Sequence, residues 1–178
     1  MSLHFGARKN TLTTQNIHRT HLDKLPVDLK KPIFDSLKAD YGKDFPDWFQ
    51  RAQNKGRPAF VVYKKPRKGE PRDLKAFLVF KKENPEQITT DGKKFKGKAL
   101  KISAMKVGEE LRGKGIGKGL IERAKKAAGF NGIQNMYVTF RKAKEQALGP
   151  FFEKFGFKKV GDYFSDPRDL VYAKTKEF

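Results

Sequence analysis

A glycine-rich segment in the second half of the chain constrains the fold more than any other feature. Residues 107–119 read Val-Gly-Glu-Glu-Leu-Arg-Gly-Lys-Gly-Ile-Gly-Lys-Gly. The alternation before this segment predicts a strand over 99–107, and the helical spacing of apolar residues after it predicts a helix over 116–128. Glycines let backbone N–H groups approach a ligand closely, and a helix N-terminus offers unpaired donors and a positive dipole end. The sequence therefore predicts a phosphate-binding turn between a strand and a helix.

Two common nucleotide-binding patterns do not fit this segment. A P-loop, G-x-x-x-x-G-K-[ST], with its G-K pair at 117–118 would need glycine at Arg112 and a hydroxyl residue at Gly119. A dinucleotide fingerprint, G-x-G-x-x-G, starting at the first alternating glycine would need glycine at Lys118. The pattern that does fit is R-x-x-G-x-G over residues 112–117. Three cations lie where a pyrophosphate would bind: Arg112, Lys114 and Lys118.

The rest of the chain predicts one α/β domain. The further elements expected are two helices over 31–41 and 44–54, two strands over 59–64 and 74–82, a strand over 135–140, a helix over 143–154 broken near Gly149-Pro150, and two strands over 157–164 and 170–174. A polar loop is expected over 83–98. Strand–helix–strand units with hairpins at both ends predict a mixed, mostly antiparallel sheet flanked by helices.

The length of 178 residues suits a single domain, and 37% apolar residues with 16 Phe suffice for a core. Residues 1–25 are polar and poorly patterned, with one short strand expected around 12–17. We therefore expect a polar leader over 1–25 and a folded domain over 26–178, with its motif-bearing core at 99–160.

Composition excludes several kinds of site. The absence of Cys excludes disulfides, thiolate metal sites and a Cys nucleophile. The three His all lie within the first 21 residues, which argues against a His-based site, so we expect no metal. No apolar run reaches the roughly 18 residues that a membrane span needs. The first ten residues lack the hydrophobic stretch of a signal peptide. We expect a cytoplasmic protein with no membrane partner.

The charge balance is strongly basic, with 40 Lys+Arg against 20 Asp+Glu and a formal net charge of +20. Such a field attracts polyanions, including nucleic acid. A lysine-rich solvated surface explains the same count, so an RNA or other polyanionic partner stays an open alternative.

The R-x-x-G-x-G segment resembles the coenzyme A pyrophosphate loop of the GNAT superfamily of acetyl-CoA-dependent N-acetyltransferases. Residues 152–157, Phe-Glu-Lys-Phe-Gly-Phe, resemble that family's [YF]-E-K-x-G-F box. Residues 136–140 lie where the family places the strand that splays away to admit pantetheine. The resemblance covers residues 27–175 in element order. It implies a GNAT-like fold and acetyl-CoA as co-substrate.

The same resemblance implies a set of binding residues. In the family, the backbone N–H of the strand before the loop polarises the thioester carbonyl, which maps to 105–107 here. Phe152 is implied as pocket wall. The implied cofactor-binding residues are Met105, Lys106, Val107, Arg112, Gly113, Lys114, Gly115, Ile116, Gly117, Lys118 and Phe152.

The chain departs from the family pattern at two positions that handle protons. Phe152 stands where relatives commonly carry the Tyr that protonates the departing thiolate, and Lys101 aligns with a Glu that serves some members as a base. The general acid and base are therefore unassigned. Tyr137 and Tyr163 are the candidate catalytic residues, and further candidates are Ser103, Glu109 and Glu110.

Three functions remain open from the sequence. The first is an N-acetyltransferase in which a primary amine of a protein or small molecule attacks acetyl-CoA directly in a ternary complex. The second is an acetyltransferase of an RNA-borne amine, like the toxins that acetylate aminoacyl-tRNA. The third is a non-catalytic member that binds coenzyme A and nucleic acid. We expect a monomer or a homodimer.

Overall fold

The computed structural model describes residues 11–64 and 67–176. The strands are β1 (His18–His21), β2 (Pro58–Lys64), β3 (Asp73–Glu83), β4 (Ala99–Val107), β5 (Asn135–Arg141), β6 (Lys158–Asp162) and β7 (Asp169–Lys174). The helices are α1 (Asp35–Tyr41), α2 (Asp44–Asn54), α3 (Ile116–Phe130) and α4 (Glu145–Glu153). Short 3-10 turns occupy Thr14–Asn16, Leu22–Lys24, Pro32–Phe34, Glu109–Leu111 and Lys142–Lys144.

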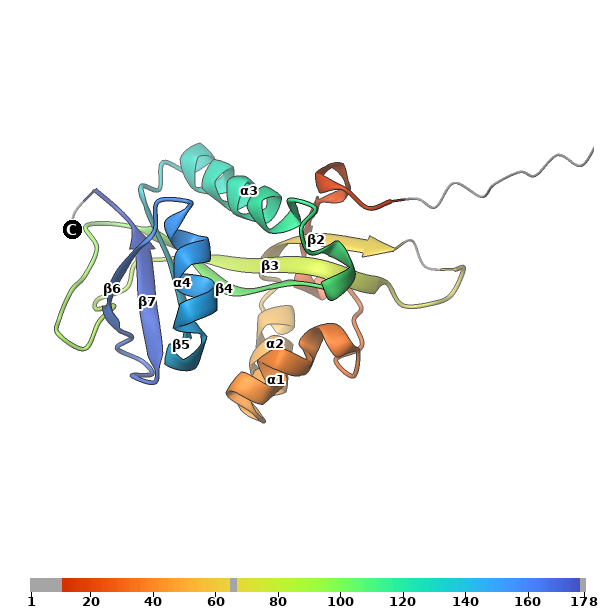
Figure 1. The fold of residues 1–178 in the computed structure, drawn as a ribbon, viewed down its shortest axis with the longest axis horizontal. Coiled ribbons are helices and arrows are strands. Elements are labelled where there is room, and N and C mark those ends of the chain that lie inside the picture. Colours follow the sequence, from red (N-terminus) through yellow and green to blue (C-terminus); the bar gives the residue numbers. More distant parts are fainter. Residues whose placement is uncertain (1–10, 65–66, 177–178) are drawn as a thin grey trace, which may run out of the picture.

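One seven-stranded sheet organises the molecule, in the order β1-β2-β3-β4-β5-β7-β6. Among the described strands, only β4 and β5 are parallel neighbours; the other adjacent strands run antiparallel. Helices α3 and α4 cover one face of the sheet, and α1 and α2 cover the other (Figure 1). The predicted α/β domain with a mixed, mostly antiparallel sheet is confirmed.

The central strands bury side chains on both faces, which divides the apolar core in two. On β2, Phe60 and Val62 pack toward α3, whereas Ala59 and Val61 pack toward α2. The aromatic side chains of α2 lie in the second cluster, where Phe45 stacks on Trp48 and Phe49 contacts both rings at an angle. Helices thus support the central strands of the sheet from both sides.

The N-terminal segment differs from the expected leader. The strand expected around 12–17 lies instead at β1, which extends the sheet beside β2, and a 3-10 turn precedes it. Ile17, Leu22 and Leu25 are buried. A Cβ on Gly119 of α3 would lie 2.8 Å from the Cδ1 atom of Ile17, so the segment crosses α3 closely. The strand reads His-Arg-Thr-His at an exposed edge and therefore carries no apolar alternation. Residues 1–10 of the expected leader lie outside the described residues.

Two other segments correct the sequence prediction. The helix α4 is not broken at Gly149-Pro150 but runs continuously with Pro150 inside it, and its predicted first residues form a 3-10 turn. Only one N–H is missing from the helix at Pro150, and Gly149 lets the Tyr172 hydroxyl approach where a Cβ would lie 2.8 Å from it. The loop over 84–98 is not only polar, because Ile88 and Phe95 are buried in a third cluster with Tyr137.

Candidate active site

The parallel strands β4 and β5 part halfway along their length. They pair from Ala99↔Asn135 to Ile102↔Val138. Opposite β3, the register shifts after Ile102, which makes Ser103 an extra residue. A bulge of this kind bends the strand that carries it. Within the described residues, β4 makes no further pairs with β5, while β5 stays paired with β7 as far as Arg141.

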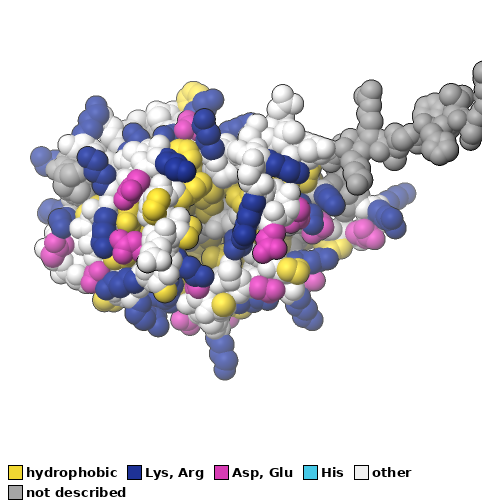
Figure 2. Space-filling model, in the orientation of Figure 1, with side chains coloured by type: hydrophobic (Ala, Val, Ile, Leu, Met, Phe, Trp, Pro, Cys, Tyr) yellow, Lys and Arg dark blue, Asp and Glu magenta, His cyan; other side chains and the backbone are white. Residues whose placement is uncertain are grey.

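A cavity of about 340 Å³ occupies this opening on the side of α3 and α4. Its walls are mainly apolar, and they are lined by Met105, Val107, Leu148, Phe151 and Phe152 among others. The Phe152 ring is 3% exposed and stacks on Phe140 with 5.9 Å between ring centroids. Figure 2 shows hydrophobic side chains around a hollow near the centre of this face, with Lys and Arg side chains along its rim.

The glycine-rich turn lies between β4 and α3, as predicted. Gly113 and Gly115 have φ values of +74° and +75°, a conformation that other residues rarely adopt. Gly115 is the N-cap of α3, and no side chain of the described chain caps this helix. The N–H groups of its first turn are therefore left for a ligand or water. Arg112, Lys114 and Lys118 are exposed around them.

The contacts of Ile116 and Gly117 refine the predicted binding set. Ile116 is 1% exposed, so its side chain packs in the core and does not contact a ligand. A Cβ on Gly117 would lie 3.2 Å from the Phe151 ring and 3.6 Å from the Met105 methyl group. Glycine at this position keeps α3 close to α4 at the wall of the cavity.

A second cavity, of about 480 Å³, lies on the opposite face of the opening. Helices α1 and α2 contribute Tyr41 and Trp48 to it, and the turn between β6 and β7 contributes Tyr163. Both cavities share the lining residues Leu37, Tyr41, Ser103, Ala104, Thr139 and Arg141. The two cavities therefore meet through the gap between β4 and β5.

Ser103 marks the point where the two cavities meet. Its Oγ atom is buried and has no hydrogen-bond partner among the described residues. A buried hydroxyl without a partner costs free energy, so this atom is suited to a ligand that fills the gap. Together with the uncapped turn and the cradle at Gly117, it fits a long phosphorylated ligand that enters between the strands.

Arg141 links three elements around the second cavity. Its Nη1 donates to Asp166 at 2.8 Å and to Asp169 at 2.9 Å, and its Nε donates to the carbonyl oxygen of Asp40 at 3.0 Å. The guanidinium also lies 4.3 Å from the centre of the Tyr41 ring. These contacts join the end of α1 to β5 and to the turn before β7.

The two carboxylates on Arg141 respond oppositely to their surroundings. Hydrogen bonds from Arg168 and Arg141 hold the pKa of Asp166 far below its usual range, against a smaller effect of burial. Burial raises the pKa of Asp169 despite the nearby Arg141. Asp169 is thus the member of the cluster that most depends on its cation.

The structure separates the two tyrosine candidates. Tyr163 lines the second cavity, and Lys101 Nζ donates to its hydroxyl at 2.8 Å. Burial by itself raises the pKa of Tyr163, but the Lys101 ammonium and a hydrogen bond with Ser165 together lower it, and the net direction is downward. Tyr137 is 1% exposed, lines neither cavity and donates its hydroxyl to Glu83. Burial, followed by Glu83, raises the pKa of Tyr137.

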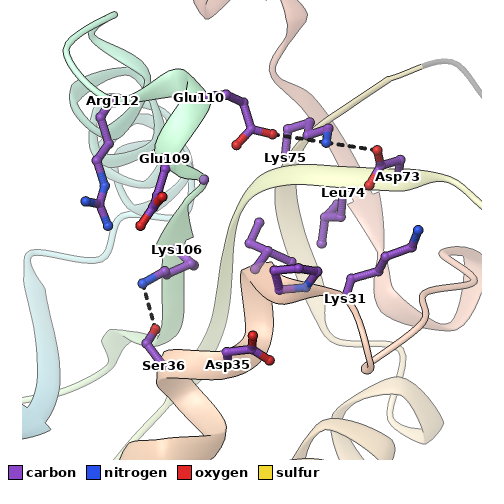
Figure 3. A pocket seen from close by; sticks show the side chains of 13 residues that line it. Lys31, Asp35, Ser36, Asp73, Leu74, Lys75, Lys106, Glu109, Glu110 and Arg112 are labelled. Atoms are coloured by element: carbon purple, nitrogen blue, oxygen red, sulfur yellow. Dashed lines mark hydrogen bonds and ion pairs between the residues drawn. The ribbon is translucent and has the colours of Figure 1, made fainter.

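The glutamate candidates and Lys106 line a third cavity, of about 470 Å³, beside the turn (Figure 3). Its charged groups largely satisfy one another: Lys75 lies 2.9 Å from Asp73 and 3.0 Å from Glu110. Lys106 Nζ donates to Ser36 Oγ at 2.6 Å, toward α1. Burial, followed by Arg112, lowers the pKa of Lys106.

Sequence reasoning missed the Arg141 cluster. Its members come from three separate stretches of the chain, and no spacing connects Arg141 with Tyr41 or with Asp169. Asp162 and Asp166 flank the turn between β6 and β7, and turn formation accounts for acidic residues there without a site.

Comparison with known proteins places the fold in a family. Residues 74–159 match a family model described as Acetyltransferase (GNAT) domain. An IAA acetyltransferase from Bacillus cereus ATCC 14579 is 20% identical, with a TM-score of 0.55 over 89% of this chain and 97% of that one. A GNAT family acetyltransferase from Elizabethkingia anophelis with acetyl-CoA bound is 12% identical, with a TM-score of 0.57 over 90% and 98%. The AtaT toxin bound to the C-terminus of the antitoxin AtaR is 17% identical, with a TM-score of 0.52 over 89% and 93%.

At these identities, the solved structures establish the fold alone. No curated protein sequence matches the chain. The family match covers the glycine-rich turn and the parting strands, and it confirms the resemblance found in the sequence. Residues 74–159 carry the GNAT acetyltransferase domain, a domain of acyltransferases.

Metal-ligating clusters and membrane-spanning helices are both absent from the described part of the chain. Across 11–64 and 67–176, no group of three or more His, Asp or Glu side chains is arranged to hold a metal ion. In the same ranges, no helix has the length and apolar character needed to cross a membrane.

Proposed function

We propose that the protein transfers an acetyl group from acetyl-CoA to a primary amine, which attacks the thioester directly in a ternary complex. The observation that carries this proposal is the meeting of two cavities through the gap between β4 and β5. A gap with cavities on opposite faces lets two substrates approach one reacting carbon from opposite sides. Holding both in line removes much of the entropic barrier to their reaction.

Different residues of the first cavity bind different parts of the co-substrate. The uncapped turn of α3, with Arg112, Lys114 and Lys118, holds the pyrophosphate. The pantetheine arm lies between β4 and β5 against Met105 and Phe152. Beyond Ile102, β4 is not paired with β5, so the N–H groups within 105–107 that point toward β5 polarise the thioester carbonyl.

The proposal is tested by thermal unfolding with and without acetyl-CoA, comparing Gly115→Glu with a matched control. Gly69→Glu makes the same change at a glycine with φ of +89°, on the turn between β2 and β3. At a ligand concentration of 100 Kd, a true site stabilises the wild type by about 2.7 kcal/mol, a shift of several degrees. We expect the shift to vanish in Gly115→Glu and to persist in Gly69→Glu.

Turnover is followed by the release of free coenzyme A, because a chain without Cys adds no thiol background to a disulfide-reagent assay. The acceptors are an alanyl peptide amide, Nα-acetyl-lysine amide and spermidine. A ligand shift with no thiol release from any amine would favour the non-catalytic alternative. No ligand shift in the wild type would refute the co-substrate assignment itself.

A second candidate acceptor is an amine carried on RNA, favoured by the net charge of +20. Exposed lysines lie at the end of the molecule where β4 and β5 begin, near Phe130, whose side chain is 90% exposed at the end of α3. Cations and exposed aromatics together suit single-stranded nucleic acid. A transfer RNA whose binding falls steeply with salt, and whose aminoacyl group becomes acetylated, would favour this acceptor.

A further inference from the structure

Lys101 and Tyr163 form a close pair in the second cavity. The Lys101 ammonium donates to the Tyr163 hydroxyl at 2.8 Å and lies 4.3 Å from the centre of its ring. The backbone of Tyr163 is fixed from two sides, since its N–H donates to the Asp169 carbonyl oxygen at 2.9 Å and it bridges to Thr89. The hydroxyl is therefore held in place by both backbone and side-chain contacts.

The pair lies next to the opening between the strands. Lys101 is opposite Tyr137 in the paired part of β4, two residues before the bulged Ser103. Lys101, Ser103 and Tyr163 all line the second cavity, and the unpartnered Ser103 Oγ lies where the two cavities meet. A group at this position reaches the face of the gap from which the acceptor approaches.

Other groups around this cavity are less suited to exchange a proton. Asp166 and Asp169 are bound to Arg141, and Tyr41, whose pKa burial raises, donates to Asp169 at 3.4 Å. Asp44 and Asp47 lie exposed on α2 at the rim. Tyr163 differs from Tyr41, Tyr137 and Tyr172, because their pKa values are raised and its own is lowered.

We propose that the Tyr163 hydroxyl, activated by the Lys101 ammonium, is the group that takes a proton from the acceptor amine. This inference rests on the proposed function and assigns its missing base. Lys101, which replaces the Glu of some relatives, acts as a positioning residue that supplies positive charge to the phenolate. One positive and one phenolic group thus do the work that a carboxylate does elsewhere.

The proton and electron balance of the step is complete without another reactant. The Tyr163 phenolate takes one proton from the ammonium form of the acceptor. The amine lone pair then forms the C–N bond, and the C–S bond breaks with its electrons on sulfur. The second proton leaves nitrogen for the thiolate, which departs as coenzyme A. Tyr163 returns its proton to solvent, so each turnover releases one proton.

The pKa of Tyr163 reflects its burial and charged groups on two neighbouring strands. Lys101 on β4 lowers the pKa, and the Glu83 carboxylate on β3 raises it. Tyr137 on β5 lies beside the pair, with its ring centre 5.5 Å from Lys101 Nζ. The other charged groups that line the cavity are Asp44, Asp47, Arg51, Arg141, Asp166 and Asp169.

The test compares Tyr163→Phe, Lys101→Met and Lys101→Arg with wild type, using acetyl-CoA and the two amide acceptors above. We expect Tyr163→Phe to lower kcat about 100-fold or more while the acetyl-CoA thermal shift is retained. Lys101→Met moves the ascending limb of the pH profile of kcat/KM to higher pH, because the phenolate loses its cation. Lys101→Arg keeps the positive charge and leaves this limb near its wild-type position. Tyr63→Phe is the matched control, a partly buried tyrosine on β2 outside the cavity.

Two measurements distinguish the titration of Tyr163 from the titration of the acceptor amine. The α-amine and the lysine ε-amine differ in pKa by about 2.5 units, so a limb that belongs to Tyr163 appears at the same pH with both. Tyrosine labelled with ¹³C at Cζ gives five signals, from which the Tyr163 titration is read directly without an acceptor. We expect Lys101→Met to raise that titration.

The possible results point in distinct directions. A wild type that releases no coenzyme A with any acceptor refutes the proposed function. If the wild type is active and Tyr163→Phe keeps a normal kcat and an unchanged pH profile, only the assignment of Tyr163 is refuted. A Tyr163 titration that does not respond to Lys101→Met refutes the role of Lys101.

Discussion

The two sides of the gap between β4 and β5 are lined by different kinds of chemical group. On the side of α3 and α4, the walls are apolar side chains and backbone, with Phe151 and Phe152 packed against Met105 and Gly117. On the side of α1 and α2, apolar side chains such as Phe45 and Trp48 alternate with charged and hydroxyl groups, which the Arg141 and Lys101 contacts join. One side offers a ligand shape and backbone donors, and the other adds paired charges.

This difference predicts which kind of substitution affects each side most. A closely packed apolar wall is destabilised by added volume, whereas a buried charge cluster is destabilised when one member is removed and its partner is left unpaired. Substitutions that remove charge are therefore expected to affect the acceptor side most, and substitutions that add volume to affect the co-substrate side.

The largest loss in the free energy of unfolding is expected for Arg141→Met. This change leaves the Asp169 carboxylate, whose side chain is 6% exposed, without its cation, at a cost of about 3 kcal/mol. Arg168→Met is the control, because Arg168 also binds Asp166 but is 71% exposed, and should cost less than about 1 kcal/mol. Urea unfolding at pH 7 measures both. Equal losses would mean that the cluster is not buried in the way described.

An intermediate effect is expected for Gly117→Val on the co-substrate side. The added methyl groups meet Phe151, whose ring is 3.2 Å from the Cβ position, and overpacking there costs about 1–2 kcal/mol. Gly129→Val, in the same helix with open space at its Cβ, should change stability by less than about 0.5 kcal/mol. Urea unfolding gives the stability difference. If Gly117→Val were as stable as Gly129→Val, the apolar wall would be loosely packed.

The smallest effect is a pH-dependent one at Asp166. Because its folded pKa lies below the ordinary value, its charged form stabilises the fold above pH 4, and this contribution is lost as the pH falls through and below 3.8. Asp166→Asn should therefore lose about 1 kcal/mol at pH 7, and the difference from wild type should shrink between about pH 5 and 3.

The comparison for this pH dependence is Asp162→Asn, which removes an exposed pair with Lys142 at 2.9 Å. It should change the stability by less than about 0.5 kcal/mol. A difference between wild type and Asp166→Asn that grows toward low pH would contradict a lowered folded pKa for Asp166. Urea midpoints at five pH values are sufficient to read the trend.

The elements that sequence patterning located best are those with strong local signals. The helices over 44–54 and 116–130 and the strand over 99–107 carry regular apolar spacing, and each was expected within two residues of its observed bounds. The exposed strand β1 was misplaced, and α4 was expected to break, because edge position and the Tyr172 contact of Gly149 are not written in local spacing.

The residues of the candidate site also fall into those that local sequence patterns located and those that only the structure located. The glycine-rich turn was found from the sequence because the backbone itself binds there, and positive φ values demand glycine at 113 and 115. Tyr163 was one of two tyrosine candidates that the sequence could not rank. The ranking came from the 2.8 Å contact with Lys101 and from the burial of Tyr137 against Glu83.

The sequence by itself determined the fold class, the phosphate-binding turn and the family, because each depends on residues that are close along the chain. Only the tertiary structure decided the acceptor side. There, Tyr41, Lys101, Arg141, Tyr163 and Asp169 come from five separate elements and turns, and their charges acquire partners only after the sheet has formed. Paired charges act over a few ångströms in space, and spacing along the chain does not record that distance.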